Sequence, residues 1–418
     1  MRILVVTFEN PAVDAILNGM REDTLSGLPA FYYPLKMLME KGHTVDILLY
    51  AEKKKEVVES QHFKRGNLFQ ICQKHKGAIA YLELPLRVAK ETRSLLKRQY
   101  YDFVYGMTEG SYMAIREATR SGIPCGLRQF GTQEMANVLE PVHSMFLRRW
   151  KALKDYTYIT LSMQSKKTFL LATNDGSRMD ELFDILRIRE KKYPFFFWRS
   201  GVHIPETQPR VDYKKCGQYP MAYDSMALSM VNRIADVKRQ DRAVMILGEL
   251  HRNGYPFHLY CIGEVSSQAM LNAAKQAAED YGVTDYVHYL GGKSQRECWQ
   301  YARNSFATIL PCEWNRLNIF YEVMGEGALV ITNDNHSIDE FIEPDTNCIL
   351  YEEDNFRQAA EKIIALVDDP ERIESIRTAA HQTAVKKFLS VEKRFGLEVQ
   401  LIEDAAMGRD ISQYPKVL

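Results

Sequence analysis

The sequence predicts an α/β protein with two doubly wound parallel sheets that face a common cleft. Short apolar runs typical of buried parallel strands begin at residues 3–7 and recur in both halves of the chain. Helical stretches separate these runs, so strands and helices alternate along the sequence. At 418 residues the chain is also longer than one hydrophobic core supports, which favours two domains. Two such sheets place ligands at the carboxyl ends of their strands.

The first half begins with a βαβ unit. A strand at residues 3–7 is followed by a polar segment, by a helix that ends at Lys41-Gly42, and by a strand at residues 45–49. The other strands expected in this half are residues 103–107, 125–130, 158–162 and 195–198, with residues 78–82 as a candidate for a short strand. A helix is expected to follow residue 162 and to run to about residue 172.

The second half repeats this order of elements after a linker at residues 205–220, which contains Pro205 and Pro209. The expected strands are residues 226–230, 259–263, 287–291, 307–311, 329–332 and 348–351. Helical patterns lie between them, including a short helix near residues 338–341. Two long helices, at about 355–367 and 370–406, finish the chain.

The net charge of zero conceals an uneven distribution. Residues 1–200 contain 31 Lys and Arg against 22 Asp and Glu, and the remaining residues contain 23 against 32. The basic first half suits an anionic surface, although it can equally be a solvated face. No helix-turn-helix or zinc signature accompanies this charge, so nucleic acid is not an expected partner.

Cysteine usage and apolar runs indicate a cytoplasmic protein. The seven cysteines are scattered, odd in number and never spaced as C-x-x-C, which indicates reduced thiols and no zinc module. The run at residues 3–7 is too short for a signal-peptide core, and nothing approaches about 18 consecutive apolar residues. Any membrane contact is therefore expected to be peripheral, at the inner face of the membrane.

Residues 146–151 mix Trp150 with several cations, as interfacial helices do. Together with the basic first half, this mixture suggests peripheral membrane contact through the first domain. The alternative is a surface helix whose Trp150 packs inward. The sequence leaves both interpretations open.

Two cations mark the loop after the first strand of the second half. Arg233 and Lys238 lie five positions apart, between an apolar lead and a helical pattern. Such a loop lies at the carboxyl end of a strand, where ligands bind. Arg offers a planar fork for phosphate oxygens and Lys a mobile charge, so the pair suits a diphosphate. The alternative is a solvated basic turn, because Arg239 and Arg242 follow at once.

Several short motifs in this order resemble the GT-B glycosyltransferases, specifically the large retaining family four, or glycosyl transferases group 1. None is specific alone, but the ordered set is strong. They are Met1–Thr7 with Ser26-Gly27-Leu28-Pro29 and Lys41-Gly42-His43-Thr44-Val45, Arg199-Ser200-Gly201-Val202-His203, Asn232-Arg233 with Lys238, Ile262-Gly263-Glu264, Val287–Gly291, and Tyr321-Glu322-Val323-Met324-Gly325-Glu326-Gly327-Ala328-Leu329-Val330.

The resemblance implies a role for each matching residue of the second half. Arg233 and Lys238 would hold the diphosphate of a nucleotide-sugar donor, and Gly263 and Gly291 would lie at the same donor site. Glu322 would accept hydrogen bonds from two ribose hydroxyls. The alternative for Glu322 is an exposed residue at a helix N-terminus, favoured by the helix dipole.

In the first domain the resemblance implies an acceptor site near Gly27 and Leu28 and the loops at residues 105–111 and 129–132. Gly27 precedes an expected helix N-terminus, where free N–H groups favour an anion or a hydroxyl-rich ligand. A plain turn is the alternative there. Glu109 and Gln129 lie in these loops and can serve polar roles.

Two departures from the family pattern concern the transfer chemistry. The family's paired glutamates are separated by seven intervening residues, which places Trp314 where the first is expected, while Glu313 lies nine positions before Glu322, one too many. Glu313, Asn315 and Asn318 are therefore the candidates for the catalytic sugar-hydroxyl contact. The usual His after the fourth strand is replaced by Phe130.

The resemblance implies four parts: an acceptor-binding domain at 1–204, the linker at 205–220, a donor-binding domain at 221–395, and a C-terminal helix at 396–418 that crosses back to the first domain. The expected activity is hexosyl transfer with retention, from a UDP-sugar, in polysaccharide biosynthesis. The residues leave the base, sugar and acceptor open. No Asp-x-Asp pair follows a strand, so no cofactor or obligatory metal is expected. The alternatives are a nucleotide-sugar epimerase and a non-catalytic GT-B scaffold or partner subunit.

Overall fold

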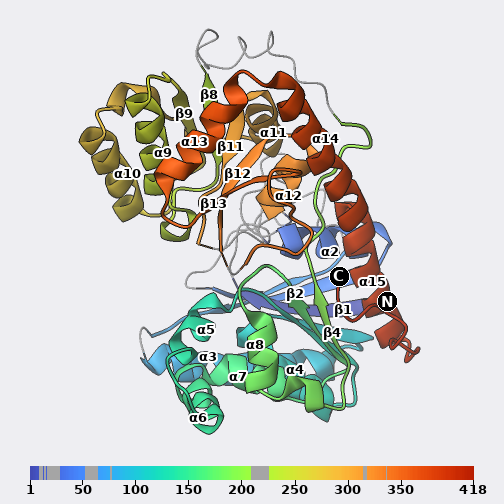
Figure 1. Cartoon of the computed structure of the whole chain (residues 1–418). Coiled ribbons are helices and arrows are strands. Elements are labelled where there is room, and N and C mark those ends of the chain that lie inside the picture. The colour runs from blue at the N-terminus through green and yellow to red at the C-terminus, as the bar shows by residue number, and fades with distance from the viewer. Residues whose placement is uncertain are drawn as a thin grey trace. The chain divides into compact units, whose positions relative to one another are not determined.

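The computed structural model describes residues 1–8, 13, 16, 29–51, 65–75, 78–208, 226–313, 318–335 and 337–418. These residues form two compact units, each with its own parallel sheet (Figure 1). Unit 1 contains Met1–Gly201 and Val391–Leu418, and unit 2 contains Val202–Ser390. Among the described residues, no helix is both long enough and apolar enough to cross a membrane.

Unit 1 has a seven-stranded parallel sheet in the order β3-β2-β1-β4-β5-β6-β7. Its strands are β1 (Arg2–Phe8), β2 (Thr44–Ala51), β3 (Leu68–Cys72), β4 (Phe103–Met107), β5 (Cys125–Gln129), β6 (Phe169–Thr173) and β7 (Phe195–Trp198). Its helices are α2 (Pro29–Glu40), α3 (Ala78–Arg98), α4 (Tyr112–Arg120), α5 (Gln133–Leu139), α6 (Met145–Asp155), α7 (Thr157–Gln164), α8 (Met179–Ile185) and α15 (Val391–Ala406).

Alternation along β1 supplies two cores, one on each face of the sheet. Ile3 and Val5 pack in the core that α2 and α15 cover, whereas Leu4 and Val6 pack in the core that α3 and α4 cover. Because both faces are buried, the strand reads in sequence as a continuous apolar run.

The end of the chain completes unit 1, as the fold prediction expected. Helix α15 packs against α2. Beyond it, the chain runs beside the edge strand β7, where the Phe197 N–H donates to the Lys416 carbonyl (2.8 Å) and the Arg199 N–H to the Leu418 carbonyl (2.8 Å). This pairing covers an edge that would otherwise present unpaired backbone groups.

Unit 2 has a six-stranded parallel sheet in the order β10-β9-β8-β11-β12-β13. Helices α9, α10 and α13 contribute to the core on one face, and α11 and α12 to the core on the other. The strands are β8 (Ala227–Val231), β9 (His258–Ile262), β10 (Val287–Tyr289), β11 (Ala307–Ile309), β12 (Val330–Asp334) and β13 (Ile349–Glu352). The helices are α9 (Gln240–Arg252), α10 (Gln268–Asp280), α11 (Gln295–Asn304), α12 (Asn318–Gly325), α13 (Phe356–Val367) and α14 (Pro370–Lys387).

The strand predicted at residues 158–162 is wrong, because this segment belongs to α7. The Thr160 hydroxyl donates to the Ala152 carbonyl (2.9 Å) and the Ser162 hydroxyl to the Ile159 carbonyl (2.8 Å), so these side chains bond locally within helical structure. The strand of this region is β6, whose five residues are all buried. The helix predicted to run on to about residue 172 was therefore misplaced as well.

Three other element predictions differ from the structure. The candidate strand at 78–82 is the first turn and a half of α3, and β3 was missed. Residues 338–341 form turns and no helix. The helix predicted over 370–406 is broken between α14 and α15, because Phe388 is extended and Ser390 bridges to Val202.

Candidate functional site

The loops after β8, β9 and β10 are joined by backbone hydrogen bonds at the carboxyl edge of the second sheet. The Asn232 N–H donates to the Ile262 carbonyl (3.0 Å), and the Ile234 N–H to the Glu264 carbonyl (2.9 Å). The Gly263 N–H donates in turn to the Gly291 carbonyl (2.9 Å). The predicted donor-site residues Arg233, Gly263 and Gly291 therefore lie on three adjacent loops, at the edge where parallel sheets bind ligands.

Gly263 allows this close approach of two loops. Its φ is +154°, and a Cβ there would lie 2.2 Å from the Asn232 carbonyl oxygen and 2.8 Å from the Arg233 nitrogen. Only glycine fits such a position without displacing the loop that carries Arg233. Glycine is favoured at position 291 for a different reason. The φ of Gly291 is +69°, and a Cβ there would meet no atom within 4 Å. The left-handed backbone alone favours glycine there.

Arg233 and Lys238 lie at the two ends of the loop that leads into α9. Arg233 is exposed, and its carbonyl accepts a hydrogen bond from Nε2 of the buried Gln240 (3.0 Å). Lys238 ends a short 3-10 helix, η5 (Asp236–Lys238), whose first residue accepts a bond from the Ser267 hydroxyl (2.6 Å). The backbone that carries both cations is thus held at several points.

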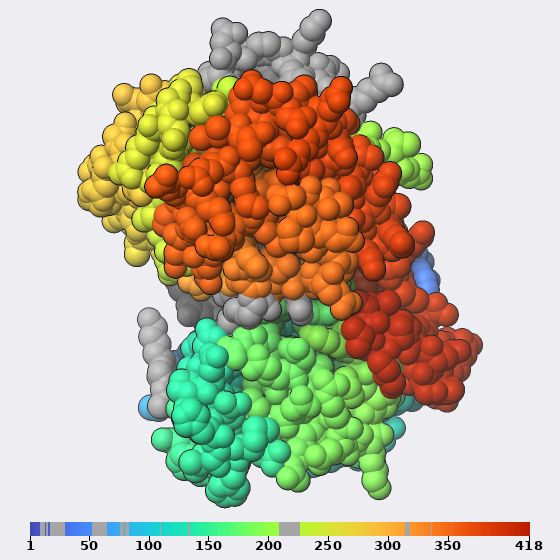
Figure 2. All heavy atoms as spheres, in the orientation of Figure 1, coloured from blue at the N-terminus to red at the C-terminus, as the bar shows by residue number. Residues whose placement is uncertain are grey.

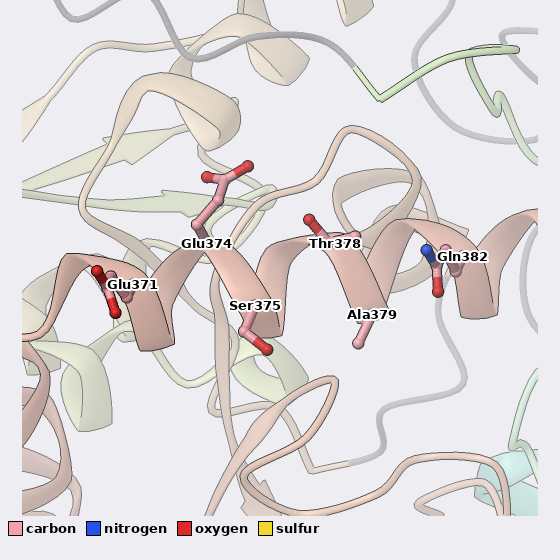
Figure 3. Close-up of a pocket in the computed structure, with 6 residues that line it drawn as sticks. All are labelled: Glu371, Glu374, Ser375, Thr378, Ala379 and Gln382. Carbon is pink, nitrogen blue, oxygen red and sulfur yellow. The ribbon is translucent and has the colours of Figure 1, made fainter.

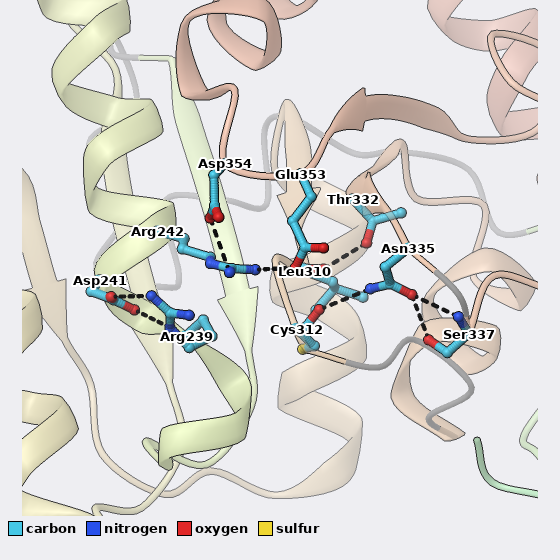
Figure 4. Close-up of polar contacts among 10 residues, drawn as sticks. All are labelled: Arg239, Asp241, Arg242, Leu310, Cys312, Thr332, Asn335, Ser337, Glu353 and Asp354. Carbon is cyan, nitrogen blue, oxygen red and sulfur yellow. Dashed lines mark hydrogen bonds and ion pairs between the residues drawn. The ribbon is translucent and has the colours of Figure 1, made fainter. Parts of the chain in front are cut away.

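The neighbouring arginines have other partners (Figure 4). Arg239 binds both carboxylate oxygens of Asp241 at 3.0 and 2.8 Å, and Arg242 binds Glu353 (3.1 Å) and Asp354 (2.9 Å). No carboxylate in the described part of the chain forms an ion pair with Arg233. The alternative of a uniformly solvated basic turn therefore does not describe Arg239 and Arg242, which are engaged in the fold.

The loop after β11 brings Glu313 to the same edge. The Glu313 N–H donates to the Val237 carbonyl (3.1 Å), next to Lys238. The Cys312 carbonyl accepts from Asn335 Nδ2 (3.2 Å), as Figure 4 shows. Burial raises the pKa of the Cys312 thiol, and the positive charge of the nearby Lys238 opposes this shift. Glu313 itself is exposed.

The other two candidates for the sugar contact are placed differently. Asn315 lies outside the described residues. Asn318 is half-buried and begins α12. Of the two candidates that the structure describes, Glu313 is the one whose backbone bonds to the Arg233 and Lys238 loop.

Glu322 is buried and turned towards α11, so it is not an exposed residue at a helix N-terminus. Its carboxylate accepts hydrogen bonds from Trp299 Nε1 (3.1 Å) and, more weakly, from Gln295 Nε2 (3.4 and 3.5 Å). Burial raises the pKa of Glu322, and the two donors oppose this rise because they stabilise the ionised form. No hydrogen bond or ion pair between described residues joins Glu322 directly to Arg233 or Lys238.

The sequence reasoning missed the residues that surround Glu322. Gln295, Trp299 and Arg303 are spaced four apart and share one face of α11, while Glu322 on α12 is followed four positions later by Glu326, in the turn after that helix. Arg303 binds Glu326 at 2.9 Å. The ring of His203 stacks on Trp299 with centroids 3.9 Å apart. The four-residue spacing of polar side chains in both segments was the signal that could have found this cluster.

The predicted acceptor residues of unit 1 are only partly described. Gly27 and Leu28 lie outside the described residues, and Glu109 begins a 3-10 helix, η2 (Glu109–Ser111), with its side chain likewise undescribed. Gln129 is buried at the end of β5, where its Nε2 donates to the Phe130 carbonyl (3.1 Å). Its Oε1 has no partner among the described residues. Asp175 follows the neighbouring strand β6, and burial raises the pKa of its carboxyl group.

Residues 222–383 match the family model described as glycosyl transferases group 1. The second unit is a glycosyl transferases group 1 domain. All the residues predicted for the donor site, from Arg233 to Glu322, lie within the matched segment. Among curated protein sequences, none matches the chain.

Solved structures resemble the whole chain, including unit 1. A sucrose-phosphate synthase from Thermosynechococcus elongatus is 12% identical, with a TM-score of 0.71, over 97% of this chain and 99% of the other. A glycosyltransferase from Rickettsia africae is 16% identical, with a TM-score of 0.65, over 97% and 98%. HepE of Anabaena, solved with UDP and glucose, is 14% identical, with a TM-score of 0.66, over 96% and 99%. At these identities the likeness shows the GT-B fold.

A shallow hollow of the group 1 domain lies along α14, away from the loops described above. It is lined by Glu371, Glu374, Ser375, Thr378, Ala379 and Gln382, whose side chains Figure 3 shows along one helix. Two carboxylates and no cation line it, so it does not suit a diphosphate. The candidate donor site of the group 1 domain therefore remains the loop edge of the sheet.

Proposed function

We propose that the protein is a glycosyltransferase that takes a sugar from a nucleotide-diphosphate donor and transfers it to an acceptor with retention of anomeric configuration. The observation that carries this proposal is the placement of Arg233 and Lys238 in a glycosyl transferases group 1 domain. They lie on the loop after β8, at the carboxyl ends of the strands, and Gly263 lets this loop lie close to the loop after β9.

The two cations suit the charge that develops during transfer. The bond between the anomeric carbon and the diphosphate oxygen breaks, and a bond from the same carbon to the acceptor oxygen forms. Negative charge gathers on the departing diphosphate, and the acceptor hydroxyl gives its proton to the departing diphosphate oxygen. A fixed guanidinium and an ammonium on a tethered loop stabilise that charge without reorganising, which is typically a large part of catalysis. The proposal includes transfer without an obligatory metal.

A UDP-sugar is the donor that the comparisons favour. HepE of Anabaena was solved with UDP-glucose, and a variant of TarM of S. aureus with UDP. Glu322 is proposed to bind the ribose, which requires its carboxylate to exchange the Gln295 and Trp299 hydrogen bonds for hydroxyls. WaaG, a glycosyltransferase of lipopolysaccharide biosynthesis, shares the fold, which supports a glycan or lipid-linked acceptor. The acceptor is proposed to bind at unit 1, near Gln129.

A thermal-shift screen against UDP, GDP, ADP, dTDP and CMP tests donor binding. A nucleotide at one hundred times its dissociation constant should stabilise the protein by about 2.7 kcal/mol, a shift of several degrees. Arg233→Ala should abolish the shift. Lys275→Ala, an exposed cation on α10, is the matched control and should retain it. If no nucleotide shifts the transition, the donor-site assignment is wrong.

Incubation with the identified nucleotide sugar then separates transfer from the alternatives. Trp314 and Phe130, at positions where the family has a Glu and a His, favour a non-catalytic partner subunit as the second candidate. That candidate predicts nucleotide binding without release of nucleoside diphosphate. A nucleotide-sugar epimerase would convert the donor without any acceptor. Release of nucleoside diphosphate, lost in Arg233→Ala, would rule out the non-catalytic alternative.

A further inference from the structure

Helix α6 of unit 1 presents its apolar side chains to solvent. Twelve large apolar side chains are exposed among the described residues, and five of them belong to this one helix. They are Met145 (40% exposed), Phe146 (75%), Leu147 (51%), Trp150 (57%) and Leu153 (45%). A surface helix normally turns such residues towards the core, so this helix is oriented in the opposite sense.

The exposed residues form one continuous stripe. With 3.6 residues per turn, Phe146, Trp150 and Leu153 lie one above another, and Leu147 lies beside them. The opposite side of the helix faces the protein, where Ala152 is fully buried. In Figure 2 the teal atoms of this part of the chain lie at the outer surface of their unit.

Local bonds hold α6 in this orientation. The Ser144 hydroxyl accepts the N–H of Leu147 at the start of the helix (3.5 Å). Arg148 donates to the carbonyls of Val142 and Glu140, and Arg149 to the Ile185 carbonyl (2.7 Å). Both guanidiniums fix the helix through backbone carbonyl groups, which carry no formal charge.

Cations flank the apolar stripe. The helix contains Arg148, Arg149, Lys151 and Lys154 against a single carboxylate, Asp155, which binds Lys151 at 2.8 Å. The Lys154 ammonium lies 5.3 Å from the centre of the Trp150 ring, beside the stripe. Apolar side chains with cations on their flanks match a lipid bilayer, whose acyl layer lies beneath anionic head groups.

We propose that α6 binds the surface of an anionic lipid bilayer. Phe146, Trp150 and Leu153 enter the boundary between head groups and acyl chains, and Lys154, beside Trp150, contacts lipid phosphates. A protein partner is less well matched, because the stripe is confined to one helix and has a cation beside it. This inference is independent of the proposed transferase activity, since no donor-site residue takes part.

Vesicle co-sedimentation of the full chain tests the proposal. The protein should sediment with vesicles of phosphatidylcholine mixed with phosphatidylglycerol, and much less with phosphatidylcholine alone. Phe146→Ser combined with Trp150→Ser should lower the partition coefficient at least about tenfold. Lys154→Gln should lower it roughly fivefold, and high salt should weaken binding of the unmodified protein.

Met407→Ser, which alters a 51%-exposed apolar residue elsewhere in unit 1, is the matched control and should bind vesicles normally. Circular dichroism and the nucleotide-induced thermal shift show whether each variant is folded. Unchanged binding by the folded double variant would overturn the proposal. So would a wild-type protein that ignores anionic vesicles, or a wild-type dimer that the double variant abolishes, because the stripe would then be a protein interface.

Discussion

Gly263 has no tolerance for a side chain, because its Cβ position is occupied by the backbone of the loop that carries Arg233. Gly263→Ala should displace that loop and destabilise unit 2 by more than about 1 kcal/mol, since it combines strain at φ +154° with a steric overlap. Nucleotide affinity should fall as well. Thermal unfolding and calorimetric titration with UDP measure the two effects.

Gly396→Ala is the matched control for this substitution. Gly396 lies within α15, and a Cβ there would meet no atom within 4 Å. Alanine should therefore stabilise the helix by up to about 1 kcal/mol. Equal effects of the two substitutions would show that the predicted backbone overlap at Gly263 has no consequence.

Burial in the folded protein disfavours the ionised form of Glu322. Because its pKa is raised in the folded protein, the folded state holds the proton more tightly than the unfolded state does. The stability that protonated Glu322 contributes is complete below the ordinary pKa near 4.5 and is lost as pH rises through the raised value. At neutral pH, Glu322→Gln should therefore raise the melting temperature of the nucleotide-free protein.

The pH dependence of this gain checks its cause. The difference between Glu322→Gln and the wild type should shrink as pH falls towards 4.5. If Glu322 binds ribose, the same substitution should weaken nucleotide binding at pH 7. A variant that is destabilised at every pH would contradict the burial argument, since glutamine can still accept the Trp299 hydrogen bond.

Strands β9 and β10 carry a histidine pair that should make unit 2 sensitive to mild acid. His258 Nδ1 and His288 Nε2 are 2.8 Å apart, and burial lowers the pKa of both. The unfolded chain therefore takes up protons first as pH falls below about 6.5. Stability present above that pH is lost as pH falls through the lowered values. His288→Gln should flatten the fall of the melting temperature between pH 6.5 and 5.5.

His143→Gln is the control for the histidine pair. His143 is exposed in unit 1 and has no place in this contact. Its substitution should leave the pH profile as steep as in the wild type. Equal slopes for wild type and His288→Gln would remove the pair as the source of the acid sensitivity.

The C-terminal segment that covers β7, residues 415–418, is expected to stabilise unit 1. Deleting residues 415–418 removes four hydrogen bonds. Three join backbone groups: the Phe197 N–H to Lys416, the Arg199 N–H to Leu418, and the Leu418 N–H to Phe197 (3.1 Å). The fourth joins Trp198 Nε1 to the Pro415 carbonyl (2.7 Å). At about 0.5–1.5 kcal/mol for each bond, unit 1 should lose roughly 2–6 kcal/mol. The uncovered edge should also promote association, which light scattering would detect. A monomeric variant with unchanged melting would contradict this role.

Elements with both faces buried were predictable from sequence, and elements decided by long-range packing were not. The apolar run at residues 3–7 corresponds to β1, with both faces of the strand inside the protein. Residues 158–162 have a similar composition, but their hydroxyls bond to helix carbonyls and the segment is α7. The orientation of α6 was left open by the sequence, because a helical pattern does not say which face a neighbouring helix covers.

The candidate site also contains residues that could be predicted from the sequence and residues that could not. The Arg233 and Lys238 loop was predictable because cations after a strand have one topological place in a parallel sheet. The surroundings of Glu322 were not, because Trp299 and Gln295 come from another helix. The engagement of Arg239 and Arg242 was also invisible, since Arg242 pairs with Glu353 and Asp354 more than a hundred residues away.

At the scale of the whole molecule, unit 1 depends on a buried ionic cluster between distant parts of the chain. Arg128 on β5 binds Glu398 on α15 at 2.7 Å, and both side chains are fully buried. Arg394 (3.0 Å) and the Tyr105 hydroxyl (2.7 Å) bind the same carboxylate. Glu398→Ala would leave buried positive charge without its partner, at a cost of about 3–5 kcal/mol.

This cost should fall on one unit. In Glu398→Ala, calorimetry should show unit 1 melting earlier than unit 2, and a bound nucleotide should raise only the second transition. The charge-reducing pair Arg128→Met with Glu398→Met should recover part of the loss, because an apolar pair leaves no buried charge. A single transition that moves as a whole would contradict this independence of the units.

The discontinuity of unit 1 also has a consequence for how the chain emerges from the ribosome. All seven strands of its sheet have been synthesised once the ribosome has passed Trp198. Glu398 and the segment that covers β7 follow only after the entire second unit. At 5–20 residues per second, Arg128 would await its counter-ion for roughly 10–50 s. During that interval the nascent first unit has an uncovered edge at β7 and a buried arginine without its carboxylate, whereas the second unit, continuous in sequence, already has all its strands.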